Sequence, residues 1–141
     1  MTTENTATAT TAEDSTTGPL SLPPATVIQL PKAALQLAEL PADEIRAGAP
    51  QAGSRKIAAG PGLNIGVWEM TTGTAVDVEV DECFLVLEGC ATVTVQPSDA
   101  AQDPRVMELR AGTIGRLAAG MHTEWVVHET LRKVYLFPAA A

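Results

Sequence analysis

Between Leu63 and Phe137, eight short segments that favour β-strands follow one another with no helical stretch among them. Each segment is rich in apolar and β-branched residues, and glycine, proline or polar turn residues separate it from the next. The segments are residues 63–70, 75–80, 83–87, 91–96, 106–109, 113–117, 124–128 and 131–137. Many short strands without intervening helices predict an all-β sandwich or barrel.

The remainder of the chain is less regular. Residues 1–24 are rich in Thr, Ala and Pro and contain three acids and no base, which predicts a disordered or arm-like N-terminal segment. Residues 25–141 are expected to form one domain. Within it, residues 25–30 favour a strand, residues 32–40 have helical spacing over two turns at most, and residues 42–61 are loop-like.

Charge excludes several classes of partner. The 141 residues include 17 acidic and 9 basic side chains, which gives a formal net charge of -8. This excess repels nucleic acid and leaves no basic patch for an anionic membrane. No apolar run is long enough to span a bilayer, and no secretory signal is evident, so we expect a cytoplasmic protein. Cys83 and Cys90 are expected to be free thiols.

Four motifs in a fixed order carry a family resemblance. The first motif, ECFLVLEG, runs from Glu82 to Gly89, and the second, GTIGRLAAGMHTEW, covers residues 112–125. They are flanked by GVWEMTTG at 66–73 and TLRKVY at 130–135. Together they resemble the small single-domain cupins related to ureidoglycine aminohydrolase and to the ethanolamine-utilisation cupin. The resemblance covers about residues 40–138 and implies a jelly-roll barrel, the double-stranded β-helix.

The sequence departs from the cupin pattern at the metal. The resemblance implies a divalent metal held by three His and one Glu, but only Glu82 stands at such a position. Residues 76–81 contain no His, and Thr123 stands where the second motif normally has one. His122 and His128 have the opposite strand parity, which predicts surface positions. Since one carboxylate is a poor site for a transition metal, we expect neither a metal nor another cofactor.

Strand alternation predicts the lining of the barrel. If Glu82 points inward, as the resemblance implies, alternate residues of this motif point inward with it and continue to do so beyond a turn at Glu88–Gly89. The inward set of the two motifs is then Glu82, Phe84, Val86, Ala91, Val93, Val95, Thr123, Trp125 and Val127. Trp68 and Trp125 serve either as core filler or as walls of a ligand pocket.

An inward carboxylate without a metal needs a cationic partner or a proton. Arg132 and Lys133 are the candidates, because the closing strand lies beside the second motif. A two-residue turn at Glu129–Thr130 points Arg132 inward, whereas a three-residue turn points Lys133 inward, and the resemblance favours Lys133. The other acids of the run, Asp77, Glu79 and Asp81, are expected on one solvated face of a strand.

These residues predict a small cupin, metal-free or metal-poor, that binds a small polar metabolite in its barrel. Its expected ligand-binding residues are Trp68, Glu82, Thr123, Trp125, Lys133 and Tyr135. Two other functions fit the same sequence. One is an enzyme, a hydrolase or isomerase acting on a ureido, amino or sugar compound, and the other is a non-catalytic accessory cupin that associates with itself. Fold alone does not decide among them.

Parity also generates a prediction about self-association. Cys83, Leu85 and Leu87 alternate with the inward residues, and we expect a second copy to cover this apolar outer face in a homodimer. In sedimentation velocity, Leu85→Asp should give monomers or insoluble protein, because a charge cannot be buried in an apolar interface. Glu82→Ala, which changes an inward residue, should remain dimeric. A soluble dimeric Leu85→Asp variant would contradict this interface.

Overall fold

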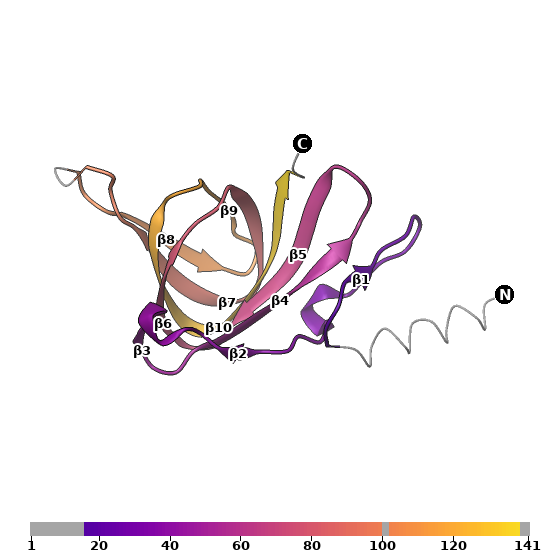
Figure 1. Cartoon of the computed structure of the whole chain (residues 1–141), viewed down its shortest axis with the longest axis horizontal. Helices are drawn as coiled ribbons and strands as arrows, with labels where there is room; N and C mark the ends of the chain where they lie inside the picture. The colour runs from indigo at the N-terminus through magenta and orange to yellow at the C-terminus, as the bar shows by residue number, and fades with distance from the viewer. Residues whose placement is uncertain (1–15, 100–101, 139–141) are drawn as a thin grey trace.

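The computed structural model of the protein describes residues 16–99 and 102–138, and within them the chain is built almost wholly of β-strands (Figure 1). In chain order the elements are β1 (Leu20–Ser21), the 3-10 helix η1 (Leu30–Lys32), β2 (Ala38–Glu39), the 3-10 helix η2 (Ala42–Glu44), β3 (Ile45–Ala47), β4 (Gln51–Ala58), β5 (Leu63–Met70), β6 (Gly73–Val78), β7 (Glu82–Val95), β8 (Arg105–Arg110), β9 (Ile114–Leu117) and β10 (His122–Pro138). The predicted all-β class is confirmed. No helix among the described residues is long and apolar enough to cross a membrane.

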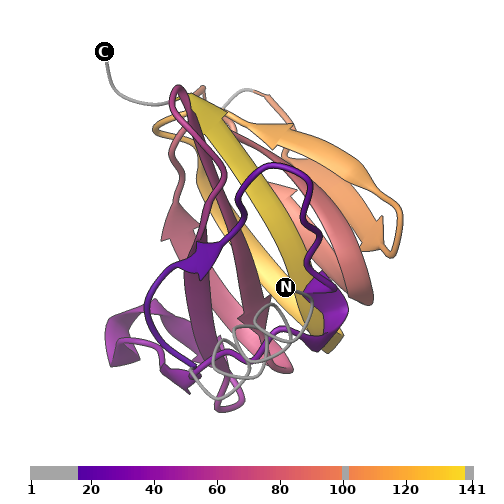
Figure 2. The same cartoon turned by 90° about the vertical axis from the view of Figure 1, so that its right-hand side faces the viewer.

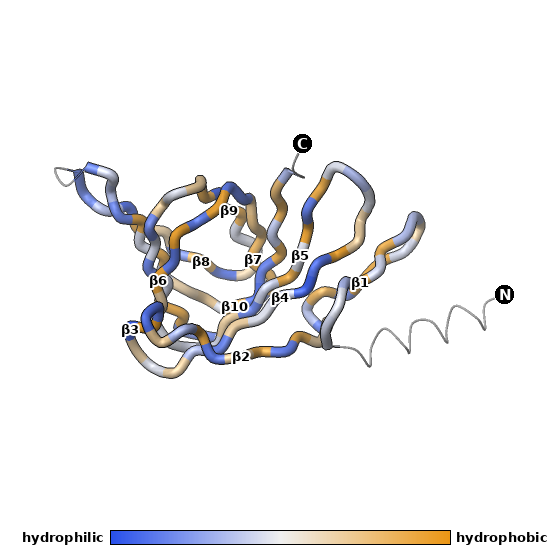
Figure 3. Tube along the Cα trace, in the orientation of Figure 1, coloured by the Kyte–Doolittle hydropathy of each residue, from blue (hydrophilic) through white to orange (hydrophobic). Residues whose placement is uncertain are grey.

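The ten described strands form one sheet that curls around a common interior (Figure 1). One path through it runs β1-β4-β5-β10-β6-β3, and β7 pairs with β10, β8 and β9. All pairs are antiparallel except β1 with β4. Along the strands, hydrophobic and hydrophilic residues succeed one another (Figure 3), the pattern of a sheet with one face on a core.

Two long strands replace the predicted hairpins. β7 runs unbroken through Gly89, and β10 runs unbroken through Glu129 and Thr130, so the turns expected at these places are wrong. Gly89 has a φ of 85°, and a Cβ at this position would collide with the backbone carbonyl of Thr130. The β10–β7 register shifts between Val127 and Lys133. Bulges bend a strand without ending it, which is how both strands pass around the barrel.

Other predictions in the first half of the domain are also wrong. β4 lies inside the stretch expected to be a loop, because its glycine permits close packing rather than a turn. A Cβ on Gly53 would collide with the carbonyl oxygen of Gln36, which lies directly against this strand. Residues 25–30 form no strand, and the expected two-turn helix at 32–40 is instead an extended segment that follows η1 and includes β2.

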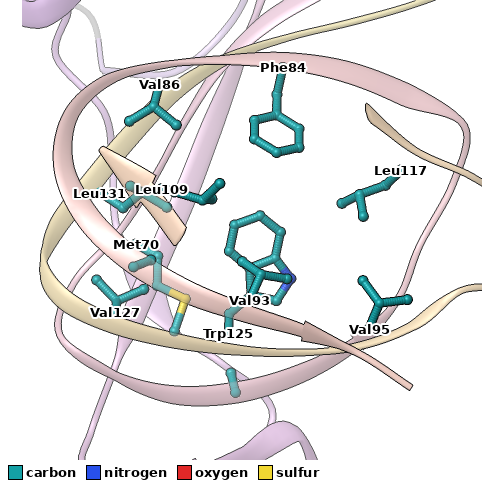
Figure 4. Packing of buried hydrophobic residues seen from close by; sticks show 12 residues of the cluster. Met70, Phe84, Val86, Val93, Val95, Leu109, Leu117, Trp125, Val127 and Leu131 are labelled. Atoms are coloured by element: carbon teal, nitrogen blue, oxygen red, sulfur yellow. The ribbon is translucent and has the colours of Figure 1, made fainter. Parts of the chain in front are cut away.

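The barrel interior holds the main apolar core (Figure 4). As the alternation of side chains predicted, inward-pointing residues of β7 are buried. Phe84, Val86 and Val93 are each exposed by 1% or less. Trp125 and Leu131 of β10 pack in the same cluster. The residues that alternate with Phe84 and Val86 on β7 point outward: Cys83 is exposed and Leu85 is 36% exposed. Cys83 and the half-buried Cys90 are both free thiols. Self-association through this face stays a prediction.

A second apolar cluster lies on the outside of the barrel. The N-terminal segment passes over β4, β5 and β10 (Figure 2, indigo), and its Leu20 is buried with Ile57 and Val67 of the sheet. The predicted arm of residues 1–24 is described only from residue 16, and residues 1–15 lie outside the described part. From residue 20 the described segment pairs with β4 as β1.

Two buried arginines fasten this segment to the sheet. Arg55 of β4 donates from Nε to the carbonyl of Gly18 at 3.0 Å and from Nη1 to that of Ala34 at 2.9 Å. Arg132 of β10 donates from Nη1 to the carbonyls of Leu30 and Ala33 at 2.8 and 2.6 Å. Charge-assisted hydrogen bonds of this kind are stronger than neutral ones.

Arg132 generates a prediction about stability. Its Nε also pairs with Glu69 at 2.8 Å, and both side chains are more than four-fifths buried. Arg132→Met should lower the free energy of unfolding by about 3 kcal/mol, since it strands a buried carboxylate and two carbonyls. Urea denaturation measures this loss. Arg46→Met removes an exposed arginine and should cost less than about 0.5 kcal/mol. Equal losses in the two variants would contradict the role of Arg132.

Candidate functional site

The barrel contains a cavity of about 450 Å³ beside its apolar core. β4, β5, β7 and β10 contribute to its walls, together with η2, β6 and the connection after β6. Its polar and aromatic lining includes Glu44, Ser54, Trp68, Asp77, Glu79, Glu82, Trp125, Lys133, Tyr135 and Phe137. Five of the six residues expected at a ligand site therefore line one cavity. The sixth, Thr123, does not line it but contacts one of its acids.

Lys133 points into the barrel and pairs with Glu82. The Nζ atom of Lys133 lies 3.3 Å from Oε1 of Glu82, and the two side chains are 6% and 10% exposed. Arg132 points to the opposite face, beneath the N-terminal segment. The open choice between the two cations is thus resolved in favour of Lys133. Neither of the turns considered produces this orientation, which follows a register shift of β10 between Arg132 and Lys133.

Three aromatic rings surround the ammonium group of Lys133. Its Nζ lies 4.9 Å from the ring centroid of Trp68, 4.8 Å from that of Phe84 and 4.7 Å from that of Trp125. The two indole rings are themselves in contact, with centroids 5.7 Å apart. Since aromatic faces attract cations, the rings offset part of the desolvation of the ammonium and fix its position.

Glu79 is the cavity residue that the sequence did not reveal. Instead of facing solvent with Asp77 and Asp81, it is 7% exposed and lines the cavity. Its Oε2 accepts hydrogen bonds from the Thr123 hydroxyl at 2.6 Å and from the Trp125 indole N–H at 3.1 Å. Burial raises the pKa of Glu79; these two hydrogen bonds oppose the rise, and the charge of Asp77 adds to it.

The parity prediction failed at Glu79 because the connection between β6, which ends at Val78, and β7 interrupts the alternation. Ala75 of β6 pairs with Trp125 and is buried in the core, and Glu79 lies on that same side of the chain. The backbone of Glu79 then bonds to the turn after β9: its N–H donates to the carbonyl of Met121, and its carbonyl accepts from the N–H of Gly120. Val78 and Val80 are exposed as a result. Nothing in the acidic run itself distinguishes Glu79 from its neighbours, because a contact some forty residues away sets its direction.

Tyr135 forms another part of the wall. Its ring packs where Gly66 has no side chain, and a Cβ there would collide with the Tyr135 ring and hydroxyl. Burial and the nearby charge of Glu82 raise the pKa of Tyr135, while a hydrogen bond to Ser54 opposes the rise. Because the rise is from an ordinary pKa of 10.0, the phenol stays protonated at neutral pH and offers a hydroxyl to the cavity.

The two histidines lie outside this cavity. Both are exposed, as predicted, and Nε2 of His128 lies 2.9 Å from the hydroxyl of Thr92 on the outer surface. No imidazole lines the cavity, and Glu82 is engaged by an ammonium group. Among residues 16–99 and 102–138, no three His, Cys, Asp or Glu side chains are grouped to hold a metal ion. These donors therefore do not fit the three-His, one-Glu metal site.

Comparisons with known proteins agree with this fold. The family model of the EutQ-like cupin domain matches residues 59–135. The EutQ protein of Clostridium difficile superposes with a TM-score of 0.59 at 19% identity, covering 82% of this chain and 88% of that one. The SPY1581 protein of Streptococcus pyogenes, of unknown function, gives 0.55 at 17% identity, with coverage of 85% and 92%.

A third solved structure is similar over a smaller part. A putative ethanolamine utilization protein Q of Salmonella typhimurium LT2 gives a TM-score of 0.51 at 20% identity, covering 64% of this chain and 72% of that one. At these identities the structures support the fold alone. No curated protein sequence matches the chain.

Glu79 generates a prediction about pH. A raised pKa means that the folded state holds a proton that the unfolded state releases at lower pH. The bound proton stabilises the folded state fully at pH values below the ordinary pKa of 4.5. This stabilisation is lost as pH rises through the pKa that Glu79 has in the folded state. The stability of Glu79→Gln relative to wild type should therefore increase as pH rises above about 4.5. Urea denaturation at several pH values measures this difference.

The matched control for this experiment is Asp81→Asn, which removes an exposed carboxylate from the same connection between β6 and β7. A Glu79→Gln difference that stays constant with pH would show that burial does not protonate Glu79.

Proposed function

The chain belongs to the EutQ-like cupin family, and we propose that it binds a small polar metabolite in the cavity of its barrel. The observation that carries this proposal is the ion pair of Lys133 and Glu82 at the cavity wall. Taking both charges out of water costs several kcal/mol per ion, and apolar side chains of similar volume often stabilise a fold as well or better. A binding role gives this pair a use that folding alone does not.

The cavity offers both donors and acceptors. Lys133 bonds to Glu82 with one N–H and keeps further N–H groups for a ligand, and the Tyr135 hydroxyl adds another donor. Glu79 supplies an acceptor, or a donor when it holds its proton. The aromatic rings of Trp68 and Phe137 provide apolar walls. Such a mixture suits a compact molecule with amino, amide or hydroxyl groups.

A second candidate function is catalysis at the same site, and Glu79 is the observation that favours it. Two of the carboxylates that line the cavity lie in different environments: the pKa of Glu79 is raised by burial, whereas Glu82 is paired with a cation. Pairs of this kind divide into a proton donor and an ionised partner. In a hydrolase or isomerase acting on a ureido, amino or sugar compound, Glu79 would be the general acid.

The binding proposal is tested by native mass spectrometry of protein purified from its own host. We expect a retained small molecule on the wild type and its loss from the double variant Lys133→Met/Glu82→Gln, which removes both charges together and so strands neither. Lys56→Met, a change at an exposed lysine of β4, should keep the ligand. Unchanged retention in the double variant would contradict the proposal.

Catalysis is distinguished from binding by Glu79→Gln. If Glu79 is the general acid, this variant should retain the molecule but fail to convert it, because the amide keeps the shape and loses the proton. Conversion by Glu79→Gln at the wild-type rate would show that Glu79 is not the general acid, and a wild type that converts nothing would leave binding as the only function.

A further inference from the structure

Lys133 is the one lysine that the fold removes from water. The chain has three lysines, and Lys32 and Lys56 are both exposed, whereas Lys133 is 5% exposed and lines the barrel cavity. In an inference that rests on the proposed function, we infer that Nζ of Lys133 condenses with the carbonyl group of a small aldehyde or ketone bound in this cavity. The product is a protonated imine, and the reaction releases one water molecule.

The first observation is that a lysine, rather than an arginine, pairs with Glu82. Arg132, the preceding residue of β10, has a structural use: it bonds to Glu69 and to two backbone carbonyls. Nζ of Lys133 bonds to Glu82 alone among the described residues. A guanidinium makes the better structural ion pair, because it can bind a carboxylate through two parallel N–H groups and keeps its proton. An amine can release its proton and become a nucleophile, as lysines do in desolvated apolar pockets.

The second observation is that the surroundings of Nζ suit the imine as well as the free lysine. An ammonium group and an uncharged carbonyl compound give a protonated imine and water, so the positive charge stays on the same nitrogen. Glu82 at 3.3 Å and the three surrounding aromatic rings offset this charge in both forms. The ion pair that holds the ammonium group therefore also stabilises the product.

Glu82 is placed to carry the protons of this reaction. Its Oε1 accepts a hydrogen bond from Nζ of Lys133, so one proton passes to it and the freed electron pair of Nζ forms a bond to the carbonyl carbon. Two of the three Nζ protons reach the carbonyl oxygen in turn by way of Glu82, the C–O bond breaks, and the oxygen leaves as water. The third proton stays on the imine nitrogen, and Glu82 ends ionised, as it began.

The cavity admits such a molecule and restricts its chemistry. Val78 and Val80 line it and are 55% and 59% exposed, so the cavity opens to solvent at the end of β6. Its volume of about 450 Å³ holds a compound of a few carbon atoms. The Tyr135 hydroxyl offers a hydrogen bond, and the carboxylates of Glu44 and Asp77 on the wall disfavour an anionic keto acid. The class is therefore an uncharged aldehyde or ketone that carries hydroxyl groups.

Reductive trapping of the full chain tests this reaction. The protein is incubated with dihydroxyacetone and sodium cyanoborohydride, which reduces a protonated imine to a stable secondary amine, and peptide mapping measures the rate of labelling at each lysine. The exposed Lys32 and Lys56 give the background rate within the same molecule. Lys133 should be labelled at least about tenfold faster than either, because the cavity holds the carbonyl group beside Nζ. Labelling of Lys133 that is no faster than that of Lys56 overturns the inference.

Three controls show whether the folded site causes the fast labelling. In urea, all three lysines should be labelled at similar rates, and a preference for Lys133 that persists there would contradict a role for the cavity. By intact mass, the double variant Lys133→Met/Glu82→Gln should lose the fast phase and Lys56→Met should keep it. Pyruvate, an anionic ketone of the same chain length, should label Lys133 more slowly than dihydroxyacetone does. Faster labelling by pyruvate would contradict the uncharged class.

Trapping and native mass spectrometry together separate this inference from the proposed function. If protein from its own host retains a small molecule that the double variant loses, but Lys133 shows no preferential labelling, the imine is wrong and the metabolite site stands. If no molecule is retained and Lys133 shows no preferential labelling, both are wrong.

Discussion

The alternation of side chains along β10 at Arg132 and Lys133 is the constraint on which both halves of the structure depend. Arg132 points out of the barrel, where it binds Glu69 and two carbonyls of the N-terminal segment. Lys133 points inward, where it binds Glu82 within a ring of aromatic side chains. β5 repeats this alternation, because Glu69 pairs in register with Arg132 and Trp68 with Lys133. A one-residue slip of β10 would exchange the two cations and disrupt both clusters.

Strand alternation allowed much of the interior to be predicted from sequence. β5 has the predicted bounds, the inward residues of β7 are buried, and five of the six expected ligand residues line one cavity. These predictions rest on period-two patterns within continuous strands, which a sheet with one buried face preserves. The resemblance to cupins indicated that Glu82 points inward, and strand alternation then predicted which other residues of the two motifs point inward.

The failures lie where the pattern is interrupted. Gly89 permits a bend that resembles a turn in sequence, and the direction of Glu79 depends on the turn around Gly120, far along the chain. β4 was missed because Gly53 signals a loop, whereas its missing side chain admits the backbone of Gln36. In each case a tertiary contact decides the local conformation. Local sequence does not contain that contact.

The chain itself supplies the cation that balances Glu82 in the barrel. A divalent metal brings more charge than one carboxylate removes, and it draws oxygen ligands and anions towards itself. The ammonium of Lys133 carries a single charge, which Glu82 offsets at 3.3 Å and the aromatic rings surround. The positive charge that a metal would bring to a three-His, one-Glu site comes here from a lysine of the chain, and the pairing of β10 with β5 rather than an exchangeable ion holds that charge beside Glu82.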